Sequence, residues 1–218
     1  MNFKKIAAVA LLGCSLSVSA LADIQAEAGD QLHRLLAKFD SFSADFDQVS
    51  GRDDSRRMES SQGTLLLAKP NRFRWIATEP FPQTLISDGE LLWIYDPDLE
   101  QATERKVSKN DSAVPALILN GQIEQLKSQY EIRLLRETVD SQLFELLPLK
   151  EAELFTRIRL LFADGLIKEL QMEDSLGQRT SILFQNQKLN PDYSESTFTF
   201  TPPKGTDLII ENSSESTD

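Results

Sequence analysis

The residues that could perform chemistry in this 218-residue chain are few and poorly placed for catalysis. Its only histidine, His33, has no second histidine with which to form a metal site or a proton relay, and its surroundings predict a position at the surface or boundary of a helix. The sequence contains no Gly-x-Ser-x-Gly motif, no Walker loop and no dinucleotide fingerprint. We therefore expect no catalytic residue, no bound metal and no cofactor.

Acidic residues are the remaining candidates for chemistry. Asp96, Asp98 and Glu100 alternate as at the start of a calcium loop, but the glycine and the distal glutamate of such a loop are absent. A proline-containing turn over residues 95–99 explains their spacing better. Pairs of carboxylates for general acid catalysis can be drawn in any chain with 34 acidic residues, so a secreted hydrolase is only a weak alternative.

The most informative pattern is a series of short predicted strands between residues 62 and 103, which includes both tryptophans. Phe73, Trp75 and Ala77 fall on one face of a strand with a period of two. Asp88-Gly89 favours a two-residue hairpin turn that folds residues 85–87 back on residues 91–95. Since the five apolar residues 91–95 cannot all point the same way, one face of this sheet must pack outward while the other lines an interior.

Helices are predicted before and within the strand series. Residues 23–39 carry one apolar stripe, residues 114–119 are apolar nearly all round, and residues 122–127 form a further short helix. Further strands are predicted at residues 42–48, 130–134, 144–146, 158–162, 166–172, 182–184 and 198–200. Because the strands come in blocks, we predict an α+β fold with a curled antiparallel sheet of about ten or eleven strands.

The first 22 residues have the features of a secretory signal peptide. Lys4 and Lys5 precede an apolar run from residue 6 to residue 18, and Ala20-Leu21-Ala22 favours cleavage before Asp23. Residues 23–210 would then form one domain, and residues 211–218 have the composition of a disordered tail. The alternative is a lipobox around Cys14, in which case that cysteine becomes the acylated first residue.

Charge limits the possible partners of the mature chain. Removing Lys4 and Lys5 from the 23 basic residues leaves 21 against 34 acidic residues, a formal net charge of −13. Nucleic acids and anionic lipid surfaces attract positive charge, so neither is expected as a partner.

Several segments, in the same order along the chain, resemble the outer-membrane lipoprotein carrier proteins of the Lol pathway. The matching segments are Gly63, residues 69–75 (KPNRFRW), 87–89 (SDG), 92–95 (LWIY), Asp96-Pro97 and 99–103 (LEQAT), flanked by 41–48 (SFSADFDQ) and 198–205 (FTFTPPKG). The resemblance implies an unclosed half-barrel capped by about three lid helices. It also implies a monomeric periplasmic chaperone that takes acylated lipoproteins from an inner-membrane ABC exporter to an outer-membrane receptor lipoprotein.

Pattern alone leaves open whether the apolar interior is a dry core or a cavity, and the resemblance favours a cavity for acyl chains. The residues expected to line it are Leu32, Leu36, Phe46, Leu65, Phe73, Trp75, Leu91, Trp93, Leu117 and Leu119. If Cys14 is acylated, the same shape would instead suit a membrane-anchored receptor or a lipoprotein-sensing module.

The resemblance further implies a latch, in which a basic residue just before a proline bonds to backbone carbonyls of the lid. The matching position here is Lys69, where the family has arginine. Lysine lacks the planar fork of five donors, so we expect a looser closed state, with Arg72 or Arg74 as possible helpers.

Overall fold

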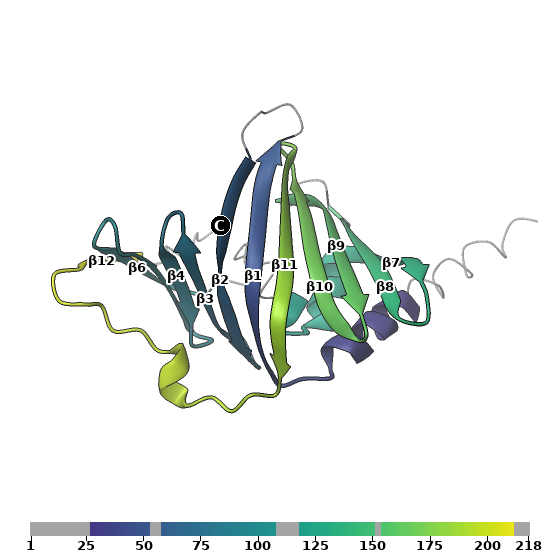
Figure 1. Cartoon of the computed structure of the whole chain (residues 1–218), viewed down its shortest axis with the longest axis horizontal. Coiled ribbons are helices and arrows are strands. Elements are labelled where there is room, and N and C mark those ends of the chain that lie inside the picture. Colours follow the sequence, from purple (N-terminus) through teal and green to yellow (C-terminus); the bar gives the residue numbers. More distant parts are fainter. Residues whose placement is uncertain (1–26, 53–57, 108–117, 151–153, 212–218) are drawn as a thin grey trace, which may run out of the picture.

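The computed structural model describes residues 27–52, 58–107, 118–150 and 154–211, and twelve strands in these ranges form one sheet (Figure 1). Their order across the sheet is β12-β6-β5-β4-β3-β2-β1-β11-β10-β9-β8-β7. Neighbouring strands are antiparallel except β12 and β6, which are parallel. Among the described residues the two end strands do not pair with each other, so the sheet is not closed.

The first six strands are β1 (Ser41–Arg52), β2 (Met58–Ala68), β3 (Arg72–Glu79), β4 (Gln83–Ser87), β5 (Leu91–Asp96) and β6 (Gln101–Lys106). The remaining six are β7 (Tyr130–Glu137), β8 (Ser141–Pro148), β9 (Phe155–Ala163), β10 (Leu166–Asp174), β11 (Gln178–Leu189) and β12 (Asp207–Glu211). Each strand predicted before residue 190 is therefore present.

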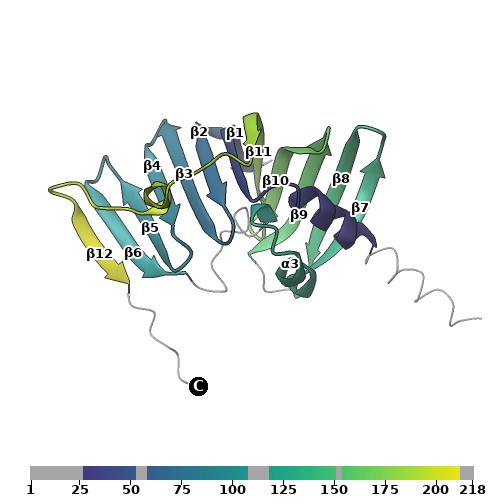
Figure 2. The ribbon, with the colours of Figure 1, turned by 90° about the horizontal axis from the view of Figure 1, so that it is seen from below.

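Two helical segments lie over the half of the sheet formed by β7 to β10 (Figure 2). Residues 27–36 form the first, and α3 (Ile123–Gln129) forms the second, with Ile123 and Leu126 buried as predicted. Of the predicted helix 114–119, only residues 118 and 119 are described, and both are helical. None of the described helices is long and apolar enough to cross a membrane.

The sheet has two apolar faces because its strands carry apolar residues at both alternating sets of positions. We call the face that carries Phe73 and Trp75 the inner face and the opposite one the outer face. Pairing of Trp75 with Leu65 and Leu85 places these three side chains on the inner face. The main core forms between the inner face and the two helical segments, and its largest fully buried side chains include Leu32, Leu36, Phe42, Phe46, Phe144 and Phe162.

The segment between β11 and β12 covers the outer face of β3 to β5. It contains the short 3₁₀ helix η1 (Glu195–Phe198), and Phe198 is only 1% exposed. Phe200 lies against Trp93 and Tyr95, with ring centroids 6.5 and 5.3 Å apart. The chain thus supplies a separate cover for each face of the sheet.

Three sequence predictions differ from this fold. The sheet has twelve strands rather than ten or eleven, because β12 adds a parallel edge strand with all five residues exposed. Residues 198–200 form no strand. Phe198 is instead the last residue of the 3₁₀ helix η1, and its side chain is buried against the outer face. Glu211, expected to begin the tail, is the last residue of β12, and residues 212–218 lie outside the described ranges.

The predicted hairpin between β4 and β5 is confirmed, but its loop is longer than two residues. Ser87 pairs with Leu92, which leaves four residues between these two paired positions. Asp88 Oδ1 accepts hydrogen bonds from the backbone N–H groups of Glu90 and Leu91, both at 2.8 Å, and only Gly89 has a positive φ. An aspartate-centred turn therefore replaces the expected tight turn.

Gly63 allows two aromatic rings to approach each other. A Cβ atom there would lie 1.8 Å from the Ile76 carbonyl oxygen and 2.9 Å from the Phe46 ring. The Phe46 ring stacks on Trp75 beside this position, with centroids 3.9 Å apart. The close packing of β1, β2 and β3 thus depends on the absence of a side chain.

We predict that Gly63→Ala lowers the free energy of unfolding by about 1–3 kcal/mol, the usual cost of overpacking. Urea denaturation followed by tryptophan fluorescence would measure the loss. Gly29→Ala is the matched control, because its Cβ would meet only the flexible end of Lys127. Equal stability of the Gly63→Ala variant and the wild type would contradict this account of the packing.

Candidate functional site

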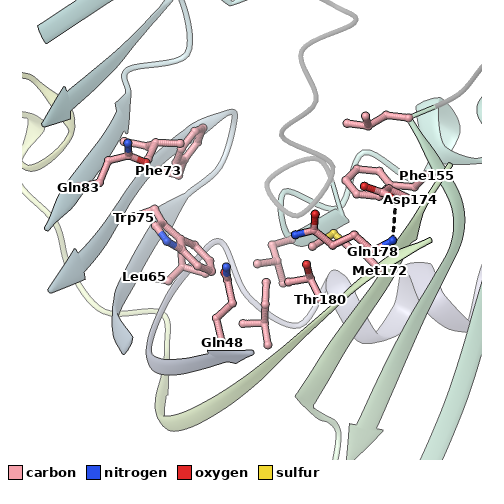
Figure 3. Close-up of a pocket in the computed structure, with 14 residues that line it drawn as sticks. Gln48, Leu65, Phe73, Trp75, Gln83, Phe155, Met172, Asp174, Gln178 and Thr180 are labelled. Carbon is pink, nitrogen blue, oxygen red and sulfur yellow. Dashed lines mark hydrogen bonds between the residues drawn. The ribbon is translucent and has the colours of Figure 1, made fainter. Parts of the chain in front are cut away.

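The main candidate site is an apolar cavity of about 440 Å³ on the inner face. Side chains from β1 to β4 line one side of it, and side chains from β9 to β11 line the other (Figure 3). Leu119, which precedes α3 in the chain, also lines it. Its volume lies within the range of about 300–1,000 Å³ that is usual for small-molecule pockets.

The wall of the cavity is mostly apolar and its remaining groups are polar but largely uncharged. The apolar lining residues are Leu65, Phe73, Trp75, Leu85, Leu119, Leu154, Phe155, Met172 and Ile182. The polar ones are Gln48, Gln83, Asp174, Gln178 and Thr180. Asp174 Oδ1 accepts hydrogen bonds from the backbone N–H groups of Leu176 and Gln178, at 2.8 and 2.9 Å. This carboxylate therefore serves the β10–β11 turn, and the cavity wall offers mainly dispersion and apolar contact.

Lys69 lies at the end of β2 and fastens the first helical segment to the sheet. Its Nζ donates hydrogen bonds to the backbone oxygens of Leu36, at 2.8 Å, and Phe39, at 2.5 Å. The ammonium also lies 4.5 Å from the centre of the Phe39 ring. Burial lowers the pKa of Lys69, and the nearby Asp40 carboxylate partly opposes this shift. A cation at the carboxyl end of a helix, where backbone oxygens lack partners, is well placed electrostatically.

A second tie joins the two helical segments to each other. Lys127 of α3 contacts Asp30 of the first segment, with Nζ and Oδ1 2.8 Å apart. The hydrogen bond from Lys127 lowers the pKa of the Asp30 carboxyl, and the same bond raises the pKa of Lys127. Asp30 is exposed and the Lys127 side chain is 32% exposed, so this ion pair orients the helices more than it stabilises them.

The sequence matches a known protein family over most of its length. A family model described as outer membrane lipoprotein carrier protein LolA matches residues 37–201. An outer-membrane lipoprotein carrier protein of Chromohalobacter salexigens is 36% identical over 92% of this chain and 95% of its own length. Its counterpart in Hahella chejuensis is 34% identical over 97% of this chain and 99% of its own length.

The chain belongs to the LolA family of outer-membrane lipoprotein carrier proteins. The resemblance predicted from the sequence is thus confirmed, and family membership places the chain among periplasmic carriers and not among enzymes.

Solved structures show weaker likeness to this carrier. A LolA superfamily protein from Nitrosomonas europaea has a TM-score of 0.49 and 17% identity, covering 81% of this chain and 98% of that one. A putative outer membrane lipoprotein-sorting protein domain from Vibrio parahaemolyticus has a TM-score of 0.47 and 10% identity, covering 82% of this chain and 97% of that one. Likenesses this low carry no argument about function.

Four of the ten residues predicted to line the carrier's cavity do so, namely Leu65, Phe73, Trp75 and Leu119. Three others lie in the packed core instead, since Leu32, Leu36 and Phe46 are at most 2% exposed and belong to the main cluster. The first helical segment therefore fills the space above β7 to β10 with its own side chains. Leu117 lies outside the described residues.

Leu91 and Trp93 are not part of the cavity because they lie on the outer face. Trp93 pairs with Ile86, which pairs with Arg74, and all three positions face away from Trp75. Trp93 donates from Nε1 to Glu104 at 2.8 Å and contacts Phe200. The apolar residues of β4 and β5 that share the face of Trp75 are Leu85, Leu92 and Ile94.

Arg72 and Arg74 do not bond to the helices either. Arg74 donates to the Thr197 oxygen at 3.1 Å, and the Arg72 guanidinium lies 5.6 Å from the centre of the Phe198 ring. Both side chains face outward on β3 and hold the segment around η1. Arg72 also donates a hydrogen bond to the backbone oxygen of Lys69, at 3.3 Å, so assistance to Lys69 from this side chain stays a prediction.

The other residues considered for chemistry have structural roles. His33 is exposed on the first helical segment, as predicted. Asp96 Oδ1 accepts hydrogen bonds from the backbone N–H groups of Asp98 and Leu99, at 3.1 and 3.2 Å, which confirms the turn. Within the described part of the chain, no group of three potential ligands could hold a metal ion.

We predict that Lys69→Met lowers the free energy of unfolding by about 1–3 kcal/mol, because two helix carbonyl groups lose a charged donor while the apolar stem remains. Lys69→Arg keeps a cation and should cost clearly less. Urea denaturation measures both losses, and hydrogen exchange should show faster opening of residues 27–39 in Lys69→Met. Equal effects of the two substitutions would mean that the hydrogen bonds contribute little.

Proposed function

We propose that this carrier holds the acyl chains of lipoproteins in the inner-face cavity, with the helical segments as a movable lid over an unclosed half-barrel. The observation that carries the proposal is the apolar wall formed by Leu65, Phe73, Trp75, Leu85 and Leu119 around about 440 Å³. A well-packed domain has few internal spaces larger than a water molecule, so a space of this size and polarity suits an apolar ligand.

Apolar burial gives the cavity enough affinity for the task. Burying one methylene contributes about 0.8 kcal/mol, so one acyl chain of ~16 carbons contributes on the order of 12 kcal/mol before ordering costs. Affinity of this kind keeps a lipid anchor out of water without any directional bond. It also accepts different lipoproteins, because only the shared acyl chains are recognised.

The lid must then open without unfolding the domain. Lys69 holds the first helical segment by hydrogen bonds to the Leu36 and Phe39 oxygens, which can break and re-form as the segment moves. Cargo that occupies the cavity displaces the lid, and the hydrogen bonds regained on closure favour release. Lys69 thus serves as the latch, with fewer donors than an arginine would offer.

Family membership and the sequence pattern support a route for this carrier. The chain is exported by a signal peptide that is cleaved before Asp23. As a monomer in the periplasm it receives lipoproteins from an inner-membrane ABC exporter and passes them to an outer-membrane receptor lipoprotein. The alternative of a membrane-anchored receptor depends on acylation of Cys14, which lies outside the described residues.

Photocrosslinking at neighbouring positions of β3 tests the cavity directly. Trp75 lines the cavity, whereas Ile76 points to the outer face. We expect a benzophenone residue at position 75 to crosslink a triacylated lipopeptide, and the same residue at position 76 to give little product. Equal crosslinking at both positions, or none at position 75 while the lipopeptide remains bound, would contradict acyl binding at this site.

A further inference from the structure

The turn between β2 and β3 contacts both helical segments of the lid, through different side chains. Lys69, the first residue of the turn, bonds to the carboxyl end of the first segment. Asn71, two residues later, accepts a hydrogen bond at Oδ1 from Gln122 Nε2. Nothing in the sequence pattern indicated this second contact, since Gln122 and Asn71 are 51 residues apart.

Gln122 occupies a position where its side chain could have served the helix instead. It is the N-cap residue of α3, yet its side chain makes no capping hydrogen bond. Glutamine is not among the residues favoured at N-caps, which are serine, threonine, aspartate and asparagine. The side chain of Gln122 is therefore committed to the turn between β2 and β3 and not to its own helix.

The backbone just before Gln122 connects this contact to the cavity. Gly121 has a φ of +67° and its N–H donates to the Ile118 oxygen at 3.0 Å, so residues 118–121 form a tight turn. Leu119, within this turn, is 1% exposed and lines the cavity. A bond that fixes Gln122 therefore also fixes the position of Leu119 over the apolar space.

The backbone of Asn71 does not by itself require the amide. Its φ is +59°, a conformation that asparagine tolerates and that glycine adopts with less strain. Glycine at position 71 would keep the turn and lose the acceptor. Aspartate would keep both the acceptor and the tolerance for this conformation. Substitutions at position 71 can therefore separate the role of Asn71 in the backbone turn from its role as a hydrogen-bond acceptor for Gln122.

We propose that Asn71 is a positioning residue that holds the 118–122 turn, and with it Leu119, over the cavity. One strand turn then fastens the two parts of the lid through different hydrogen bonds, those of Lys69 to residues 36 and 39 and that of Asn71 to residue 122. The functional part of this inference rests on the acyl-binding role proposed above, whereas the contact itself does not.

Hydrogen exchange on the cargo-free protein tests the contact. We expect Asn71→Gly and Gln122→Met to speed exchange of residues 118–126 by about three- to tenfold, the effect of losing one partly buried hydrogen bond. Residues 27–36 should be accelerated clearly less, because Lys69 still holds them in both variants. Asn71→Asp should restore the wild-type rate, and combining Asn71→Gly with Gln122→Met should add nothing further, because both remove the same bond.

Two results would overturn the contact: unchanged exchange at residues 118–126 in Asn71→Gly, or equal acceleration in residues 27–36 and 118–126. A release assay tests the role, with a fluorescent triacylated lipopeptide as the probe. Faster release from Asn71→Gly than from Asn71→Asp supports positioning, and equal release despite local loosening refutes it. Failure of the wild type to bind the lipopeptide would refute the proposed function while the exchange result still decides the contact.

Discussion

The structure depends on the alternation of side chains along strands that are apolar on both faces. An apolar sheet face left in water costs free energy in proportion to its area, so each face needs its own cover. The first helical segment and α3 cover the inner face of β7 to β10, and the segment with η1 covers the outer face of β3 to β5. The inner face of β1 to β4 has less cover from the described residues, and the cavity lies there.

Because the inner face is covered unequally, it carries both a packed core and a cavity. Leu32, Leu36 and Phe46 are buried in the main core, whose close packing stabilises the domain. Trp75, partly buried and stacked on Phe46, stands at the boundary between the packed core and the cavity. A ligand can therefore enter and leave while the main core stays intact. The contacts of Lys69 and of Asn71 are polar and few, so the parts of the lid are held by bonds that are easily exchanged.

The sequence predicted the family, the order of elements and most strands, because turn residues and apolar periodicity are local signals. It did not predict which face each strand presents across the sheet. Both tryptophans were assigned to the cavity, yet pairing of Leu85 with Ile94 turns Trp93 to the outer face. A two-residue turn at Asp88-Gly89 would have paired Leu85 with Leu92, which lies on the same face as Ile94. The predicted hairpin therefore already indicated that Trp93 faces away from Leu85. The contacts of Asn71 and of Arg74 join residues far apart in the chain, and no local pattern reports them.

Mass spectrometry of the protein isolated intact from periplasm tests the central claim most directly. We expect a fraction of the molecules to carry a triacylated lipoprotein in a one-to-one complex, on a mature chain that begins at Asp23. A chain that is always free of acylated cargo, or one that is itself acylated at Cys14, would contradict the account of a soluble lipoprotein carrier.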